Sequence, residues 1–111
     1  MKVLLLCEFG QNRSRHLAEY LSEKGYDTNI GGTVADTPSE LQRKIDWADT
    51  VVTVHPVVRD AIKPLYLEGK RVIELDVDDK PKIPLEGQAW REYQEKSVYS
   101  KLRTLIDFEL K

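Results

Sequence analysis

Four short strand-like runs alternate with helical segments along this chain, and this alternation restricts the possible folds more than any other feature. The runs cover residues 2–6, 27–30, 50–54 and 71–75. Strands that alternate with helices typically form a parallel sheet with right-handed connections. We therefore predict an α/β fold with a central four-stranded parallel sheet, in the order 2-1-3-4, and with helices on both faces. A chain of 111 residues has room for one core, so residues 1–111 are expected to form a single domain.

Capping and breaking residues delimit the helical segments. Ser14 is a favourable N-cap for a helix that Gly25 terminates. A second helix is predicted over residues 38–47, and a short one is expected to follow His55. An acidic, proline-bearing loop spans residues 76–87. The last helix is long and amphipathic, and its predicted inward-facing residues are Trp90, Tyr93, Val98, Leu102, Leu105 and Ile106.

Composition argues against several classes of partner. Charged residues make up 32% of the chain and the net charge is −2, so no broad basic surface is expected for nucleic acid or an anionic membrane. The longest apolar run, residues 3–7, is too short to span a bilayer, and the first residues do not resemble a secretory signal. The single cysteine cannot form an internal disulfide, which is typical of a reducing cytoplasm. Because no Cys/His cluster exists, we expect no metal site. We also expect no other cofactor, and we expect a monomer.

Cys7 and Arg13 flank a short loop between the first predicted strand and the first predicted helix. Such a loop can direct backbone N–H groups and a helix N-terminus at one point in front of the Cys7 sulfur, where a phosphate would bind. Arg13 could then contact two phosphoryl oxygens with its forked guanidinium. The same positive field would lower the pKa of the thiol into a window of roughly 3.5–7.5. A nucleophile inside a phosphate cradle indicates phosphoryl transfer through a cysteinyl phosphate, whereas an isolated strand-end cysteine is usually an inert apolar residue.

The segment Cys-Glu-Phe-Gly-Gln-Asn-Arg-Ser at residues 7–14 resembles the C-x5-R-S loop of the low-molecular-weight protein tyrosine phosphatases. Together with Gly-Gly-Thr at 31–33, it is most similar to the branch that acts on phosphoserine-proline repeats of the RNA polymerase II tail. The likeness extends to about residue 80, although the chain lacks room for that branch's insertions. It implies a cysteine-dependent phosphatase acting on a phosphorylated protein or peptide, or on a small phosphomonoester.

The resemblance also assigns roles to individual residues. Cys7 would be the nucleophile, Arg13 would bind the transferred phosphoryl group, and the Ser14 hydroxyl would donate a hydrogen bond to the Cys7 sulfur. The general acid of these enzymes follows the fourth strand, which places it at Asp79, with Asp76 and Asp78 as alternatives. The residues implied to bind the substrate phosphate are Glu8, Phe9, Gly10, Gln11, Asn12, Arg13 and Ser14.

Two positions depart from that pattern. Gly10 stands where these families usually have an asparagine that braces the loop, so Asn12 is expected to take over that task. Glu8 puts a carboxylate beside the nucleophile, where it would repel thiolate and phosphate unless it points to solvent.

Two other interpretations of the Cys7 loop stay open. One is a phosphocarrier of the enzyme IIB type, which also has a cysteine at the end of its first strand. The other is a non-catalytic module that binds phosphate or a protein. His55 is expected at the same edge of the sheet, either lining the pocket or holding a turn.

Overall fold

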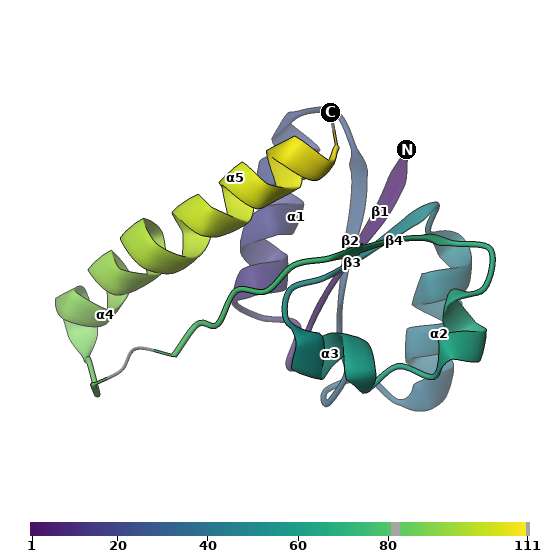
Figure 1. The fold of residues 1–111 in the computed structure, drawn as a ribbon, viewed down its shortest axis with the longest axis horizontal. Coiled ribbons are helices and arrows are strands. Elements are labelled where there is room, and N and C mark those ends of the chain that lie inside the picture. The colour runs from purple at the N-terminus through teal and green to yellow at the C-terminus, as the bar shows by residue number, and fades with distance from the viewer. Residues whose placement is uncertain (81–82, 111) are drawn as a thin grey trace.

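The computed structural model describes residues 1–80 and 83–110 (Figure 1). Its parallel sheet has the predicted order, β2-β1-β3-β4. The strands are β1 (Lys2–Cys7), β2 (Asp27–Gly32), β3 (Thr50–Thr53) and β4 (Arg71–Glu74). The helices are α1 (Arg13–Glu23), α2 (Pro38–Trp47), α3 (Pro56–Asp60), α4 (Gly87–Tyr93) and α5 (Ser100–Glu109), and a π-helical turn (Gln94–Tyr99) joins the last two. The fold class predicted from the alternation of elements is therefore confirmed.

Strand β1 lies in the middle of the sheet and explains the apolar run that forms it. It pairs with β2 on one side and with β3 on the other, and its residues from Val3 to Leu6 are fully buried. A parallel strand that is covered on both faces reads as a continuous apolar run, because neither face meets water. Cys7 ends this strand opposite Gly32 of β2, at the carboxyl edge of the sheet.

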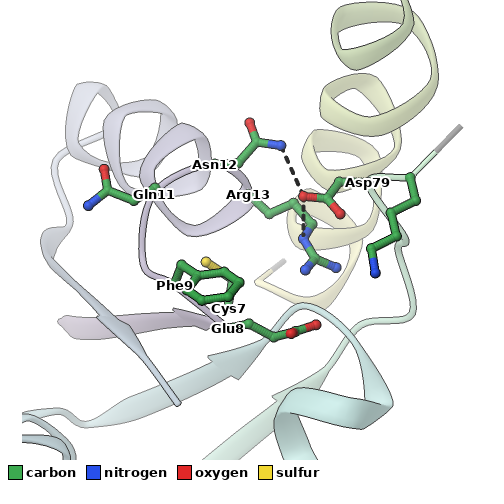
Figure 2. Close-up of a pocket in the computed structure, with 8 residues that line it drawn as sticks. Cys7, Glu8, Phe9, Gln11, Asn12, Arg13 and Asp79 are labelled. Atoms are coloured by element: carbon green, nitrogen blue, oxygen red, sulfur yellow. Dashed lines mark hydrogen bonds and ion pairs between the residues drawn. The ribbon is translucent and has the colours of Figure 1, made fainter. Parts of the chain in front are cut away.

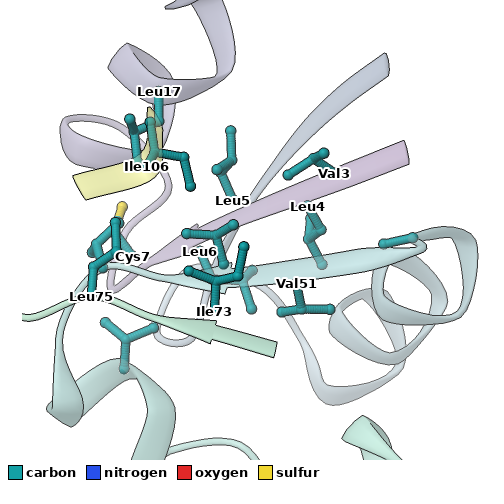
Figure 3. Packing of buried hydrophobic residues seen from close by; sticks show 14 of the residues in the cluster. Val3, Leu4, Leu5, Leu6, Cys7, Leu17, Val51, Ile73, Leu75 and Ile106 are labelled. Carbon is teal, nitrogen blue, oxygen red and sulfur yellow. The ribbon is translucent and has the colours of Figure 1, made fainter. Parts of the chain in front are cut away.

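Helices cover both faces of the sheet, as Figure 1 shows. Helices α1 and α5 lie on one face, and α2 lies on the other. Figure 3 shows where side chains from the strands meet those from α1 and α5, with Leu17 of α1 and Ile106 of α5 near the Cys7 end of β1. Cys7 itself belongs to this buried cluster, so the nucleophile proposed from the sequence lies at the edge of the core.

Some boundaries differ from the prediction. Helix α1 begins at Arg13 with Asn12 as its N-cap, so the prediction that Ser14 caps this helix is wrong. The hydroxyl of Ser14 is directed instead at the Cys7 sulfur. At the other end of α1, Gly25 adopts a φ of +95° and terminates the helix as predicted. Strand β2 continues through Gly32, where a turn was predicted, because Gly32 pairs with Cys7.

The C-terminal helical region also departs from the prediction. It begins at Gly87 rather than at residue 90, and the π-helical turn interrupts it. Val98, Leu102 and Ile106 are buried as predicted, whereas Trp90 and Leu105 are both 39% exposed. No residue of α4 is fully buried, although Tyr93 at its end packs against the core, and full burial in this region begins at Gln94.

Candidate active site

The loop between β1 and α1 depends on a glycine at residue 10. Gly10 has a φ of +70°, a conformation that residues with a Cβ rarely adopt. A Cβ there would also lie 3.2 Å from the backbone carbon of Gly31 in β2. In this conformation the Gly10 N–H donates to the Cys7 sulfur over 3.1 Å. The glycine that departs from the resembled families is thus required by the backbone path of this loop.

Cys7 is a buried thiol whose surroundings favour the thiolate. Burial raises its pKa, but hydrogen bonds from the Ser14 hydroxyl and from the backbone N–H groups of Ser14, Gln11 and Gly10 lower it. Together the hydrogen bonds lower the pKa by more than burial raises it, so the pKa of Cys7 lies below its ordinary value of 9.0. The Ser14 Oγ lies 3.0 Å from the sulfur, which is the contact predicted from the sequence. A thiolate, and not a thiol, is the nucleophilic form of cysteine.

Arg13 is buried beside this thiol and is held by the acidic loop. Its side chain is only 6% exposed, and its Nη1 donates to the backbone carbonyl of Val77 over 2.7 Å. Its Nε lies 3.6 Å from Oδ2 of Asp79 and has no hydrogen-bond partner among the described residues. A buried guanidinium with an unused donor is suited to bind an anion, because an unpaired buried N–H is costly.

The structure separates the three candidate aspartates. Asp79 is half-buried, and its Oδ2 accepts a hydrogen bond from Asn12 Nδ2 over 3.2 Å. Asp76 is 79% exposed and lies 3.7 Å from His55 Nε2. Asp78 is exposed, and its Oδ1 accepts from the Lys80 N–H. Of the three, Asp79 is the one that shares a pocket with Cys7.

That pocket has a volume of about 220 Å³ and contains most of the predicted phosphate-binding residues (Figure 2). Dashed lines in Figure 2 join Asp79 to Asn12 and to Arg13. The residues that line it are Cys7, Glu8, Phe9, Gln11, Asn12, Arg13, Asp79 and Lys80. Ser14 and Gly10 do not line this pocket. Each contacts the Cys7 sulfur instead, Ser14 through its hydroxyl and Gly10 through its backbone N–H.

A second hollow of about 160 Å³ continues from the first. It shares Glu8, Arg13, Asp79 and Lys80 with that pocket, and it adds His55, Val57 and Asp78. His55 satisfies both interpretations offered for it, because it lines this hollow and its Nδ1 caps α3 by accepting from the Val57 N–H. In Figure 2 the Glu8 carboxylate is directed away from the Cys7 sulfur, which reduces the expected repulsion.

The side chain of Asn12 joins its loop to the acidic loop and to the C-terminal helical region, where two of its partners are residues that the sequence analysis did not single out. Its Nδ2 donates to Gln94 Oε1 over 2.8 Å as well as to Asp79, and its Oδ1 accepts from the Tyr99 hydroxyl. A signal for Gln94 was present in the sequence. It is a polar residue at the start of the series 94, 98, 102 and 106, whose other members are apolar and buried.

No group of three or more His, Cys, Asp or Glu side chains within residues 1–80 and 83–110 is placed to hold a metal ion. Over the same residues, no helix has the length and apolar character needed to cross a bilayer. Searches with models of known protein families and among curated protein sequences find no match for this chain. What the site does is therefore inferred from its own geometry and chemistry.

Proposed function

We propose that this protein is a cysteine-dependent phosphatase that hydrolyses phosphomonoesters on a phosphorylated protein or peptide. The observation that carries the proposal is the meeting of Cys7, Arg13 and Asp79 in one pocket, with hydrogen bonds that favour the Cys7 thiolate. The similarity of residues 7–14 to the loop of the low-molecular-weight tyrosine phosphatases supports it. The single free thiol suits a reducing compartment, so we place the activity in the cytoplasm.

In the first step, the Cys7 thiolate attacks phosphorus while the bond to the ester oxygen breaks. Arg13 and the backbone N–H groups of the loop bind the non-bridging oxygens and stabilise the charge of the transition state. Asp79, in its protonated form, donates a proton to the departing oxygen. The products are the free hydroxyl compound and a cysteinyl phosphate.

In the second step, water attacks the cysteinyl phosphate and the sulfur–phosphorus bond breaks. Asp79, now a carboxylate, accepts a proton from that water. The Ser14 hydroxyl donates to the sulfur and stabilises the thiolate as it leaves. Phosphate is released, and both residues return to their starting forms.

The shape of the site favours a peptide over a small phosphomonoester. The two hollows adjoin, because Glu8, Arg13, Asp79 and Lys80 line both of them, and the second extends the surface beyond the pocket that contains Cys7. Phe9 in the first hollow is 59% exposed, and Val57 in the second is also exposed. Exposed apolar side chains beside a phosphate site can contact the residues that flank a phosphorylated side chain.

Hydrolysis of para-nitrophenyl phosphate by reduced protein between about pH 4 and pH 8 tests this proposal. We expect turnover by the wild type, none by Cys7→Ser, and a loss of about 10²-fold or more in kcat for Asp79→Asn. The rate of Asp79→Asn should also no longer fall on the basic side of the profile. Asp76→Asn, in the same loop but exposed, is the matched control and should retain the rate.

Absence of Cys7-dependent turnover in the wild type would contradict the phosphatase proposal. Stable phosphorylation of Cys7 without release of phosphate would then favour the phosphocarrier. Binding of phosphate without phosphorylation would favour the non-catalytic module.

A further inference from the structure

We propose that Gln94 is a positioning residue for Asp79, and that the π-helical turn exists to direct it there. This inference rests on the proposed function, because it concerns the general acid of that reaction. Gln94 lies outside the loop that resembles the phosphatases and does not line the pocket, and its side-chain hydrogen bonds go to Asn12 and to the backbone of Asp79.

The buried amide of Gln94 joins the two loops that form the site. Its Oε1 accepts from Asn12 Nδ2 over 2.8 Å, and its Nε2 donates to the backbone carbonyl of Asp79 over 2.9 Å. Gln94 is 1% exposed, so water cannot readily replace either bond. Gln94 therefore links the loop that carries the nucleophile to the loop that carries the acid, in addition to the direct bonds from Asn12 to Asp79 and from Arg13 to Val77.

The π-helical turn brings two side chains to one face of the helix. Five residues of an α-helix advance about 140° beyond a full turn, so Gln94 and Tyr99 would face different directions in a regular helix. A π-helical turn is wound less tightly, with hydrogen bonds between residues five apart, so residues five apart are separated by a smaller angle than in an α-helix. Both side chains accordingly reach Asn12, where Gln94 accepts from Nδ2 and Tyr99 donates to Oδ1.

These contacts determine which way the Asn12 amide faces. The Oε1 atom of Gln94 can only accept a hydrogen bond, so the amide of Asn12 must turn its Nδ2 donor, and not its oxygen, toward Gln94. Burial raises the pKa of Tyr99, which keeps its hydroxyl protonated as a donor to Oδ1. The ring of Tyr99 is itself stacked on His16, with a centroid distance of 4.1 Å.

The orientation of Asn12 in turn selects the oxygen of Asp79 that can carry the acid proton. Asn12 Nδ2 and Arg13 Nε both approach Oδ2 of Asp79. Because Oδ2 already accepts from Asn12, Oδ1 is the oxygen left to carry the acid proton toward the leaving group. Gln94 thus fixes both the backbone position of Asp79 and, through Asn12, the orientation of its carboxyl group.

The dependence of rate on the leaving group separates this role from a merely structural one. Departing para-nitrophenolate needs little protonation, whereas departing phenolate needs much more, so a misplaced acid slows phenyl phosphate selectively. Because release of the leaving group belongs to the first step, we expect kcat/KM of Gln94→Leu to fall about 10-fold on phenyl phosphate and no more than about 2-fold on para-nitrophenyl phosphate, with inhibition by phosphate unchanged. Adding Gln94→Leu to Asp79→Asn should cause no further loss, because both changes act on one group.

Two variants control the experiment. Gln42→Leu makes the same change at an exposed position of α2 and should leave both rates unaltered. Tyr99→Phe removes only a hydroxyl, and should show the same selective loss to a smaller degree even where Gln94→Leu fails to fold.

Equal losses of Gln94→Leu and Tyr99→Phe in kcat/KM on the two esters, or weaker inhibition by phosphate, would overturn the inference while leaving the proposed function intact. A wild type that hydrolyses neither ester would instead overturn the proposed function, and the role of Gln94 with it.

Discussion

Ser14 lies in the first turn of α1, and its hydroxyl contacts the sulfur of Cys7 at the end of β1. Burial raises the pKa of Cys7 and is the largest single influence on it, but the Ser14 hydroxyl is the largest of those that lower it. Ser14→Ala should therefore raise the pKa of Cys7 and reduce the thiolate fraction at neutral pH. The midpoint of the pH dependence of alkylation by iodoacetamide should move to higher pH.

The control for this change is Ser39→Ala, which removes an exposed hydroxyl near the start of α2. Its alkylation midpoint should match the wild type. If Ser14→Ala reacted with an unaltered midpoint, the backbone N–H groups alone would account for the lowered pKa of Cys7.

At the scale of elements, the loop of the site is shaped by its contact with β2. A Cβ at Gly32 would lie 2.7 Å from the backbone oxygen of Glu8 and 2.8 Å from the backbone nitrogen of Gly10. Backbone atoms cannot swing away as a flexible side chain can, so Gly32→Ala must displace the loop. We expect a loss of about 2–3 kcal/mol in the free energy of unfolding, measured in urea, together with weaker inhibition by phosphate.

Gly69→Ala separates this steric effect from ordinary backbone strain. Gly69 has a φ of +75°, but nothing lies within 4 Å of a Cβ placed there. Its substitution should cost about 1 kcal/mol and leave phosphate inhibition unaltered. A smaller cost for Gly32→Ala than for Gly69→Ala would contradict the close contact between β2 and the loop.

The elements that the sequence predicted well are those whose signal is local. The strand runs and the residues from Cys7 to Ser14 are contiguous, so their pattern required no knowledge of the fold. The N-cap of α1 was misassigned because Ser14 has a partner, Cys7, whose position depends on the sheet. The π-helical turn was missed because buried positions four residues apart, such as Gln94, Val98, Leu102 and Ile106, fit a regular α-helix equally well.

The acid and its support could be predicted only in part. The resemblance placed the proposed acid at Asp79, with Asp76 and Asp78 as alternatives, but the difference in exposure between Asp79 and Asp76 follows from packing against the C-terminal helical region. The bond between Asn12 and Gln94 joins residues 82 positions apart, and no local pattern indicates such a contact.

At the scale of the whole molecule, Cys7, the proposed nucleophile, is part of the hydrophobic core that holds the domain together (Figure 3). Unfolding removes Cys7 at once from its burial and from the hydrogen bonds that lower its pKa. Ionisation of this thiol must therefore affect the stability of the entire fold as well as the reactivity of the site.

The sign of this effect follows from the two pKa values. The folded thiol titrates below 9.0 and the unfolded thiol near 9.0, so between these values the unfolded state binds more protons. The contribution of Cys7 to stability should be complete above 9.0 and should disappear as the pH falls through the folded pKa. We expect the difference in the free energy of unfolding between wild type and Cys7→Ser to grow in favour of the wild type as pH rises through this window. Urea unfolding at several pH values under reducing conditions measures it. A difference that stays constant with pH would mean that Cys7 titrates alike in both states, and that its surroundings do not favour the thiolate.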